Sequence, residues 1–213
     1  QKGDFGAAFV QVKALDKKSG AAGEKVFDFG ETCDNNEEYT LAIKAFQYII
    51  DLGKEKTGYY RTANYRMLNS LKKKITQSPN YTREDLEKLE QKYLYTLNDV
   101  GRAPHSINIM KDLGQLQGVY MQKFDDATSV LEEAVKLASR TPKAEAECKL
   151  LLADVMVMQG NIWDASLLYS QVDLAFKEDK LSHEAKFKNA KIFYYTANFV
   201  LAQSQLDVLK SST

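Results

Sequence analysis

Apolar residues recur along the chain at spacings that place them on one face of a helix. In each copy an apolar or aromatic residue is followed three positions later by alanine, and four positions after that by a large apolar residue. Spacings of three and four return to the same side of an α-helix. We call the alanines of this pattern the anchor alanines: Ala8, Ala42, Ala127, Ala165 and Ala202. The pattern predicts a chain of repeated amphipathic helices.

A small residue suits a point where two helices cross closely, because a larger side chain would hold the backbones apart. Twelve residues before three of the anchors stands a second small residue, which is Gly30, Ala153 or Ala190. In another copy this place holds Gln115, and Gly114 beside it can serve with a shifted register. The pattern therefore favours antiparallel helix pairs in which each anchor helix follows a partner helix.

The anchors recur 34, 85, 38 and 37 residues apart. The gap of 85 has room for one enlarged pair, with helices near 57–76 and 82–100 and Leu89 in the place of the alanine. We predict a single solenoid over 1–213, in which 1–18 is the second helix of a truncated repeat. The predicted repeats are 24–53, 57–100, 105–140, 143–178 and 183–211.

Turn and capping signals fall between these segments. Gly160 stands where a left-handed residue is expected to end a helix. Thr82 and Ser182 are predicted N-caps, and Thr141 is predicted to cap a helix that begins with a proline.

The anchors and their period resemble the tetratricopeptide repeat, which carries A-x3-F in a period of about 34 residues. The residues that carry the resemblance are Phe5/Ala8, Tyr39/Ala42, Phe124/Ala127, Ile162/Ala165 and Phe199/Ala202. It implies an all-α, right-handed solenoid of antiparallel helix pairs, with about five repeats and the third enlarged. It also implies a concave groove lined by the first helix of each pair.

The segments from Tyr169–Val172 to Asp207–Lys210 also resemble large multi-repeat envelope proteins of Bacteroidetes-type bacteria. This resemblance implies the periplasm or the cell envelope. Because neither end of the sequence carries a capping helix, we expect the chain to be part of a longer array, with any export signal outside it.

Composition narrows the class of function. The 29 basic and 29 acidic residues balance, whereas a nucleic-acid-binding protein usually has a basic excess. No stretch is long and apolar enough to predict a membrane-spanning helix. Cys33 and Cys148 stand far apart and form no metal or disulfide pattern.

Catalytic motifs do not occur. His183-Glu184 lacks the second histidine of a zinc-protease motif, and His105 stands in a predicted loop. There is no glycine-rich phosphate loop and no nucleophile elbow. We therefore expect no catalytic residue, no metal, no cofactor and no enzymatic activity.

A binding role has more support in the sequence. Eight and seven residues before the anchors stand large apolar groups in the last three copies, whereas Asp34-Asn35 stands there in an earlier one. The predicted groove residues are Val119, Tyr120, Val157, Met158, Tyr194 and Tyr195. The alternative is that most of these residues pack as core, because apolar residues at helical spacing usually do.

Some tetratricopeptide proteins bind a C-terminal carboxylate with a Lys/Asn/Arg clamp. The corresponding places in this chain are mostly acidic or apolar: Phe27/Glu31, Asp112/Leu116, Leu150/Asp154 and Phe187/Lys191. The sequence therefore argues against such a clamp.

We predict a non-catalytic scaffold for a protein or peptide partner. The alternatives are an oligomerisation segment that associates with itself, or a helical accessory domain of a larger envelope protein or enzyme. The enlarged pair has clustered aromatic and basic residues, which indicate either a docking surface or elongated packing: Tyr59, Tyr60, Arg61, Tyr65 and Arg66.

Overall fold

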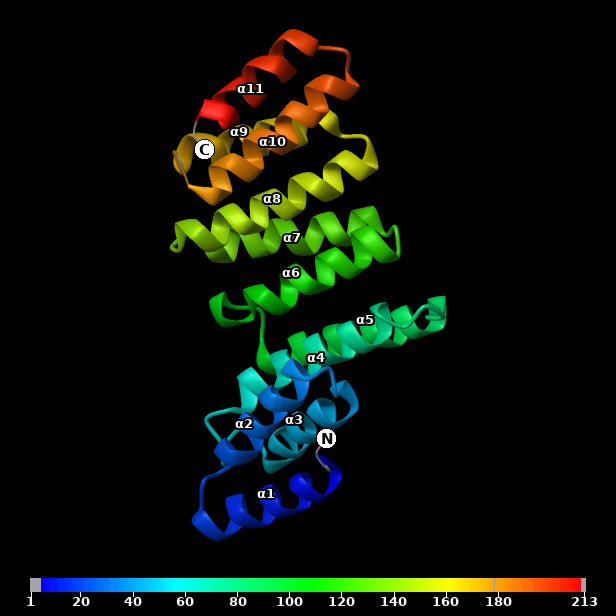
Figure 1. Ribbon diagram of the computed structural model, residues 1–213, viewed down its shortest axis with the longest axis vertical. Coiled ribbons are helices and arrows are strands. Elements are labelled where there is room, and N and C mark those ends of the chain that lie inside the picture. The colour runs from blue at the N-terminus through cyan, green and yellow to red at the C-terminus, as the bar shows by residue number, and fades with distance from the viewer. Residues whose placement is uncertain (1–4, 178, 212–213) are drawn as a thin grey trace. The chain divides into compact units, whose positions relative to one another are not determined.

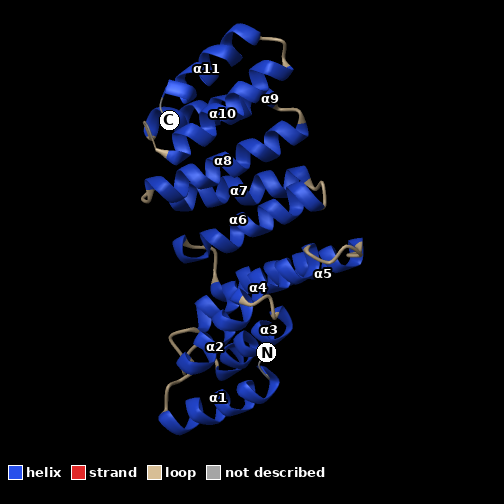
Figure 2. Ribbon diagram, viewed as in Figure 1, coloured by secondary structure: helices blue, strands red, loops and turns tan. Residues whose placement is uncertain are grey.

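The chain is built of helices joined by short loops (Figure 2). The computed structural model describes residues 5–177 and 179–211, and no strand occurs among them. The chain divides into two compact units, of which the first ends at Gly101 and the second begins at Arg102. We call them the N-terminal and C-terminal units and describe each by itself.

The N-terminal unit contains five helices that pack in chain order (Figure 1). They are α1 (Phe5–Ser19), α2 (Glu24–Asn35), α3 (Tyr39–Leu52), α4 (Tyr60–Thr76) and α5 (Arg83–Val100). Val26, Phe46, Ile49 and Met67 form a buried core between α2, α3 and α4. Helix α1 adds Phe5, Phe9 and Val12 to this core, and its anchor Ala8 is half-buried.

The C-terminal unit begins with a short 3₁₀ turn, η1 (Pro104–Ser106), and then α6 (Ile107–Gln115), which continues into a π-helical segment, η2 (Leu116–Tyr120). Five helices follow: α7 (Phe124–Ala138), α8 (Pro142–Gln159), α9 (Ile162–Ala175), α10 (Lys180–Tyr195) and α11 (Phe199–Ser211). Each packs against the next. Ala127 and Ala165 are fully buried, and Ala202 is buried in the face that α11 turns towards α10.

These helix pairs confirm the predicted all-α fold of successive antiparallel pairs. The predicted ranges 1–18 and 143–178 include residues 1–4 and 178, which lie outside the described residues. The single continuous array from 1 to 213 stays a prediction.

Glycines mark two of the closest helix approaches. A Cβ atom on Gly30 would lie 2.7 Å from Cε1 of Phe46, four residues after the anchor Ala42. A Cβ atom on Gly114 would lie 2.5 Å from Cγ of Leu131, four residues after the anchor Ala127. Gly114, and not Gln115, is therefore the small residue of its repeat.

The π-helical segment explains this shift in register. Gly30 stands 12 residues before its anchor, and Gly114 stands 13 before its own. A π turn accommodates one extra residue in a helix. The segment Leu116–Tyr120 lies between Gly114 and Ala127, so it absorbs the added residue and both glycines reach their anchor helix.

Two of the predicted caps are wrong. Thr141 stands at the N-cap position before Pro142, but its side chain makes no capping hydrogen bond. Thr82 caps α5 in a capping box with Asp85, and Gly160 has a left-handed φ of 92° after α8. Ser182 does not cap α10, because Asp179 accepts the capping hydrogen bond from the Leu181 amide. Ser182 is buried instead, and its hydroxyl donates to the Asp173 carboxylate.

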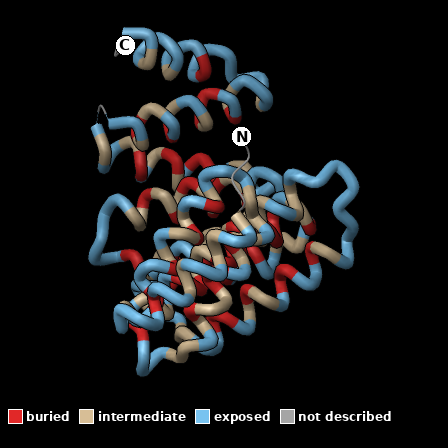
Figure 3. The backbone as a smooth tube through the Cα atoms, turned by 60° about the horizontal axis from the view of Figure 1, so that its bottom comes forward, coloured by how far each residue is buried: buried red, intermediate tan, exposed pale blue. Residues whose placement is uncertain are grey.

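Burial is uneven along the C-terminal unit. Figure 3 shows that most of α11, the helix next to the label C, is exposed. Ala202 is the buried residue of this helix. None of the described helices has the length and apolarity that a membrane crossing requires.

Candidate binding groove

The six predicted groove residues lie at the C-terminal ends of η2, α8 and α10, the first helices of three successive pairs. All are exposed except Tyr120, which is half-buried. Four of them line a single cavity of about 380 Å³: Val119, Val157, Met158 and Tyr195. The structure thus brings residues from three helices to one concave surface within the C-terminal unit.

Tyr120 and Tyr194 are not among the residues that line this cavity. Tyr194 packs edge-on against Phe199 of α11, with ring centroids 5.7 Å apart. Of the two neighbouring tyrosines of α10, only Tyr195 lines the cavity, whereas in α8 both Val157 and Met158 line it.

The cavity has further apolar walls that the sequence patterns did not identify. They are Leu151 from α8, Ile162 from α9 and Ile192 from α10. Leu151 stands seven residues before Met158, and Ile192 stands three before Tyr195. Both residues therefore lie one or two helical turns before a predicted groove residue, on the same side of the helix.

A hydrogen-bonded network forms the polar floor of the cavity. The Tyr169 hydroxyl donates to Oδ1 of Asp154 at 2.6 Å, and Lys188 Nζ donates to Oδ2 of the same carboxylate at 2.7 Å. Lys188 also pairs with Glu184 at 2.7 Å. The network joins α8, α9 and α10, so it fixes the helices that carry the apolar walls.

The network shifts the pKa of its members. Burial and the hydrogen bond to Asp154 raise the pKa of Tyr169 above its usual range. Burial lowers the pKa of Lys188, but the hydrogen bonds to Asp154 and Glu184 outweigh burial and leave this pKa raised. Tyr169 is therefore protonated and Lys188 charged at neutral pH.

A second cavity of about 280 Å³ continues the groove towards the N-terminal ends of the same helices. It shares Gln115, Leu151, Asp154 and Lys188 with the first cavity. Its other charged residues include Asp112, Glu184, and Lys111, which pairs with Glu147 at 2.5 Å. We call the first cavity the apolar half of the groove and the second cavity the charged half.

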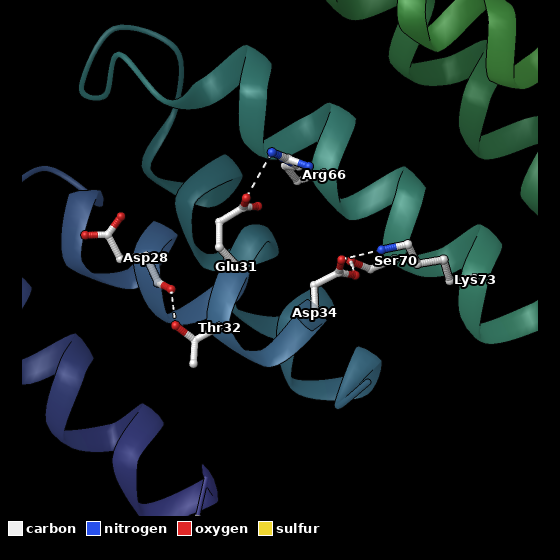
Figure 4. A network of polar contacts seen from close by, with 7 residues as sticks. All are labelled: Asp28, Glu31, Thr32, Asp34, Arg66, Ser70 and Lys73. Atoms are coloured by element: carbon white, nitrogen blue, oxygen red, sulfur yellow. Dashed lines mark hydrogen bonds and ion pairs between the residues drawn. The ribbon is translucent and has the colours of Figure 1, made fainter. Parts of the chain in front are cut away.

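In the N-terminal unit, the corresponding positions hold acidic side chains that bind residues of α4 (Figure 4). Asp34, eight residues before its anchor, accepts hydrogen bonds from Ser70 Oγ at 2.7 Å and from Lys73 Nζ at 2.5 Å. Glu31, eleven residues before the anchor, pairs with Arg66 at 2.9 Å. These contacts hold α4 against the face of α2 that would line a groove.

The clustered aromatic and basic residues of the enlarged pair also make contacts inside the N-terminal unit. The Tyr59 ring packs on Phe27 at 5.0 Å, and the Tyr60 hydroxyl donates to Asp99 at 2.6 Å. With Arg66 bound to Glu31, these contacts favour elongated packing over a docking surface for these three residues.

The described residues offer no grouping of three or more His, Cys, Asp or Glu side chains that could hold a metal ion. Burial raises the pKa of both Cys33 and Cys148 to about 11, so both thiols are protonated at neutral pH. A protonated, buried thiol is a poor nucleophile. The arrangement suits noncovalent binding in the groove.

No family model matches the sequence, and no curated protein matches it. Solved structures do match the fold. BtubC from P. vanneervenii has a TM-score of 0.76 at 11% identity, over 98% of this chain and 87% of that one. A Podosopora anserina kinesin light chain with nearly identical TPR-like repeats has a TM-score of 0.68 at 12% identity, over 89% of this chain and 93% of that one.

YrrB, described as a TPR protein with an unusual peptide-binding site, has a TM-score of 0.62 at 16% identity, over 97% of this chain and 92% of that one. At these identities the matches show the fold alone. The chain therefore has the helical fold of tetratricopeptide-like proteins. The resemblance to bacterial envelope proteins is not confirmed by these matches.

Proposed function

We propose that this chain is a non-catalytic scaffold that binds a protein or peptide segment in the groove of its C-terminal unit. The observation that carries the proposal is the convergence of exposed apolar side chains from η2, α8 and α10 on one cavity of about 380 Å³. Ligand sites are typically concave and mostly apolar, with a few polar groups that fix orientation. The apolar half of the groove has this character.

The residue types in the groove also support binding. Met158 is half exposed, and methionine adapts its shape to different apolar partners. Tyr195 is 79% exposed, and tyrosine is enriched at protein interfaces because it offers a large apolar surface with a polar tip. Side chains of this size gain most when a partner covers them.

The polar floor favours a rigid site. Asp154 is bonded to both Tyr169 and Lys188, so the positions of α8, α9 and α10 are fixed before any partner arrives. A preorganised site loses less conformational entropy on binding. YrrB, a TPR protein with an unusual peptide-binding site, gives a precedent for peptide binding on this fold.

A selection from a random peptide display library tests the proposal. We expect the chain to enrich peptides with large apolar side chains, and we expect Met158→Asp to weaken their binding at least tenfold, because it places a charge in the cavity. Leu167→Asp is the matched control, since Leu167 is exposed on α9 and lines neither cavity. Equal binding by the Met158→Asp variant and the unaltered chain, with helicity intact in both, would rule out this groove.

The two tyrosines of α10 give a finer test. Tyr195 lines the cavity, whereas Tyr194 packs against Phe199. We expect Tyr195→Ala to weaken the selected peptides about tenfold, in the range of an aromatic interface residue. Tyr194→Ala should change their affinity by less than about threefold, and the opposite ranking would contradict the assigned orientation of α10.

Self-association is a second candidate, and the outer face of α11 supports it. Phe199, Val200 and Val208 are exposed there, Val200 at 81%. Exposed apolar clusters often mark protein contacts. We expect light scattering to show a mass above one chain at high concentration, and Val200→Asp to restore one chain. A strict monomer at all concentrations excludes this candidate.

A further inference from the structure

The ionisable side chains are distributed unequally along the groove. The apolar half is lined by one carboxylate, Asp154, and by two ammonium groups, Lys188 and Lys191. Lys188 is held by Asp154 and Glu184. Lys191 is exposed and has no ion pair among the residues that the structure describes. The charge that the apolar half offers to a partner is therefore positive and lies on α10.

The charged half has the opposite balance. Besides Asp112, which has an interaction of its own, three carboxylates line it, Glu147, Asp154 and Glu184, against the two ammonium groups of Lys111 and Lys188. The pairs Lys111–Glu147, Lys188–Asp154 and Lys188–Glu184 already occupy both ammonium groups. An excess of negative charge remains at this end of the groove.

We propose that the groove selects an extended segment that carries a basic side chain at one end, an acidic side chain in the middle and large apolar side chains at the other end. The basic side chain lies in the charged half, the apolar ones fill the cavity beside Met158 and Tyr195, and the acidic one pairs with Lys191. This inference rests on the proposed function and names the class of partner.

Helix geometry sets the spacing of the two charges. Along α10, Glu184 and Lys191 are seven residues apart, which is about 10 Å at 1.5 Å per residue. Along α8, Glu147 and Met158 span eleven residues, or about 16 Å. An extended peptide covers these distances in about three and five residues. The acidic side chain of the partner is thus about three positions from the basic one, and the apolar side chains follow about two positions further on.

The division of the groove into two small cavities favours an extended partner. The cavities, of about 380 and 280 Å³, share Gln115, Leu151, Asp154 and Lys188 and follow one another along the helices. They fit side chains that project from an extended backbone across the face of α8.

Synthetic peptides and charge reversal test the inference on the full chain. The reference probe is a fluorescent peptide with a lysine, a glutamate three positions further on, and leucine and phenylalanine after the glutamate. The reversed probe has lysine in place of the glutamate. We expect the unaltered chain to prefer the reference probe about tenfold, because a like charge opposite Lys191 repels. The preference should shrink as salt rises, since the groups are near the surface.

The variant Lys191→Glu should invert this preference and bind the reversed probe more tightly than the reference probe. The matched control is Lys180→Glu, which makes the same change in charge on the same helix at an exposed residue that lines neither cavity. We expect the control to keep the original preference.

The outcomes distinguish a failure of this inference from a failure of the proposed function. If Lys191→Glu leaves the preference unchanged while Met158→Asp still removes binding, the groove binds through apolar contacts only and the inference is overturned. Absence of binding of the reference probe to the unaltered chain overturns it as well. If Met158→Asp binds the reference probe as tightly as the unaltered chain does, both the proposed function and the inference are overturned.

Discussion

The two units place opposite kinds of side chain at equivalent helix positions. Eight residues before the anchor, α2 of the N-terminal unit has Asp34, whereas α8 of the C-terminal unit has Val157. Asp34 is bound by Ser70 and Lys73 of the neighbouring helix α4. Val157 has no such partner and lines an open cavity. One position thus closes a helix face in the first unit and leaves it open in the second.

Under the proposed function, this difference gives the two units different roles. A half-buried carboxylate needs a cation or a donor, so Asp34 draws α4 against α2 and the contact stabilises the unit. An exposed apolar side chain gains free energy only when another molecule covers it. The C-terminal unit therefore keeps apolar surface that a partner can bury, and the N-terminal unit has the character of a support.

The largest expected effect comes from the helix crossings that both units share. Gly114→Ala should lower the free energy of unfolding by about 2 kcal/mol, because the new Cβ would lie under 3.0 Å from three atoms of buried Leu131. The better helix propensity of alanine offsets part of the strain, by up to about 1 kcal/mol. Urea unfolding followed by circular dichroism measures the change.

Substitutions of two other glycines test whether crowding of the new Cβ causes this loss of stability. In Gly30→Ala the new Cβ meets only the edge of the Phe46 ring, so the N-terminal unit should lose less stability. Gly58→Ala introduces a Cβ into open space and should change the free energy of unfolding by less than about 0.5 kcal/mol. A loss in Gly58→Ala as large as that in Gly114→Ala would show that crowding is not the cause.

The closed face of α2 gives the second prediction. Asp34→Asn keeps the shape but removes the charge that holds Lys73, and it should destabilise the N-terminal unit by about 1.4 kcal/mol. The neighbouring Cys33 is fully buried, so it reacts with a thiol reagent only when this region opens. We expect its labelling rate to rise about tenfold, measured in a variant in which Cys148 is replaced by serine.

Asp28→Asn is the matched control, because Asp28 is exposed on the same helix and its carboxylate makes no ion pair among the described residues (Figure 4). The labelling rate of Cys148, measured with Cys33 replaced by serine, should stay unchanged in both variants. A rise at Cys148 equal to that at Cys33 would mean that the two units open together.

The fold follows from the sequence because its main signal is local. Alanine and glycine recur at fixed spacing before large apolar residues, and helix geometry alone then assigns the contact face. Ala42, Ala127 and Ala165 are fully buried, as such a face requires. The register at Gly114 needed one further fact, the π turn at Leu116–Tyr120, which no spacing in a single copy reveals.

The groove was less predictable because it depends on how helices are rotated against one another. The sequence does not distinguish Tyr194 from Tyr195. In the structure, Tyr194 packs against Phe199 and does not line the cavity, whereas Tyr195 does. Contacts between helices decide the groove, and local patterns do not contain them. The cap at Ser182 was wrong for a local reason as well, since Asp179, three residues earlier, caps α10 and leaves the Ser182 hydroxyl to Asp173 of α9.

Alkaline pH gives the third prediction, with an effect of about 1 kcal/mol. Tyr169→Phe removes the hydrogen bond to Asp154 and should cost about 1 kcal/mol at neutral pH. Because the folded pKa of Tyr169 lies above the unfolded value of about 10, its stabilising contribution is complete below pH 10 and is lost as the pH rises further. The difference between the variant and the unaltered chain should therefore narrow above about pH 10.

Tyr60→Phe is the counterpart in the N-terminal unit, where the hydrogen bond to Asp99 and burial raise the pKa of the phenol. Tyr60 is more exposed than Tyr169. We therefore expect Tyr60→Phe to lower the free energy of unfolding by less, and we expect this difference to change less with pH. Urea unfolding at neutral pH and at about pH 10.5 compares the two. A difference for Tyr169→Phe that widens with pH would contradict the sign of the shift.

The smallest expected effect distinguishes a support from a binding surface. Lys73→Ala should cost the N-terminal unit about 1 kcal/mol, because it leaves the half-buried carboxylate of Asp34 without its cation. Lys191→Ala should change the free energy of unfolding by less than about 0.5 kcal/mol, because Lys191 has no ion pair to lose among the described residues. We expect Lys191→Ala instead to weaken the binding of acidic peptides. If Lys191→Ala destabilises the chain as much as Lys73→Ala does, Lys191 serves the fold, and the contrast between a closed and an open helix face disappears.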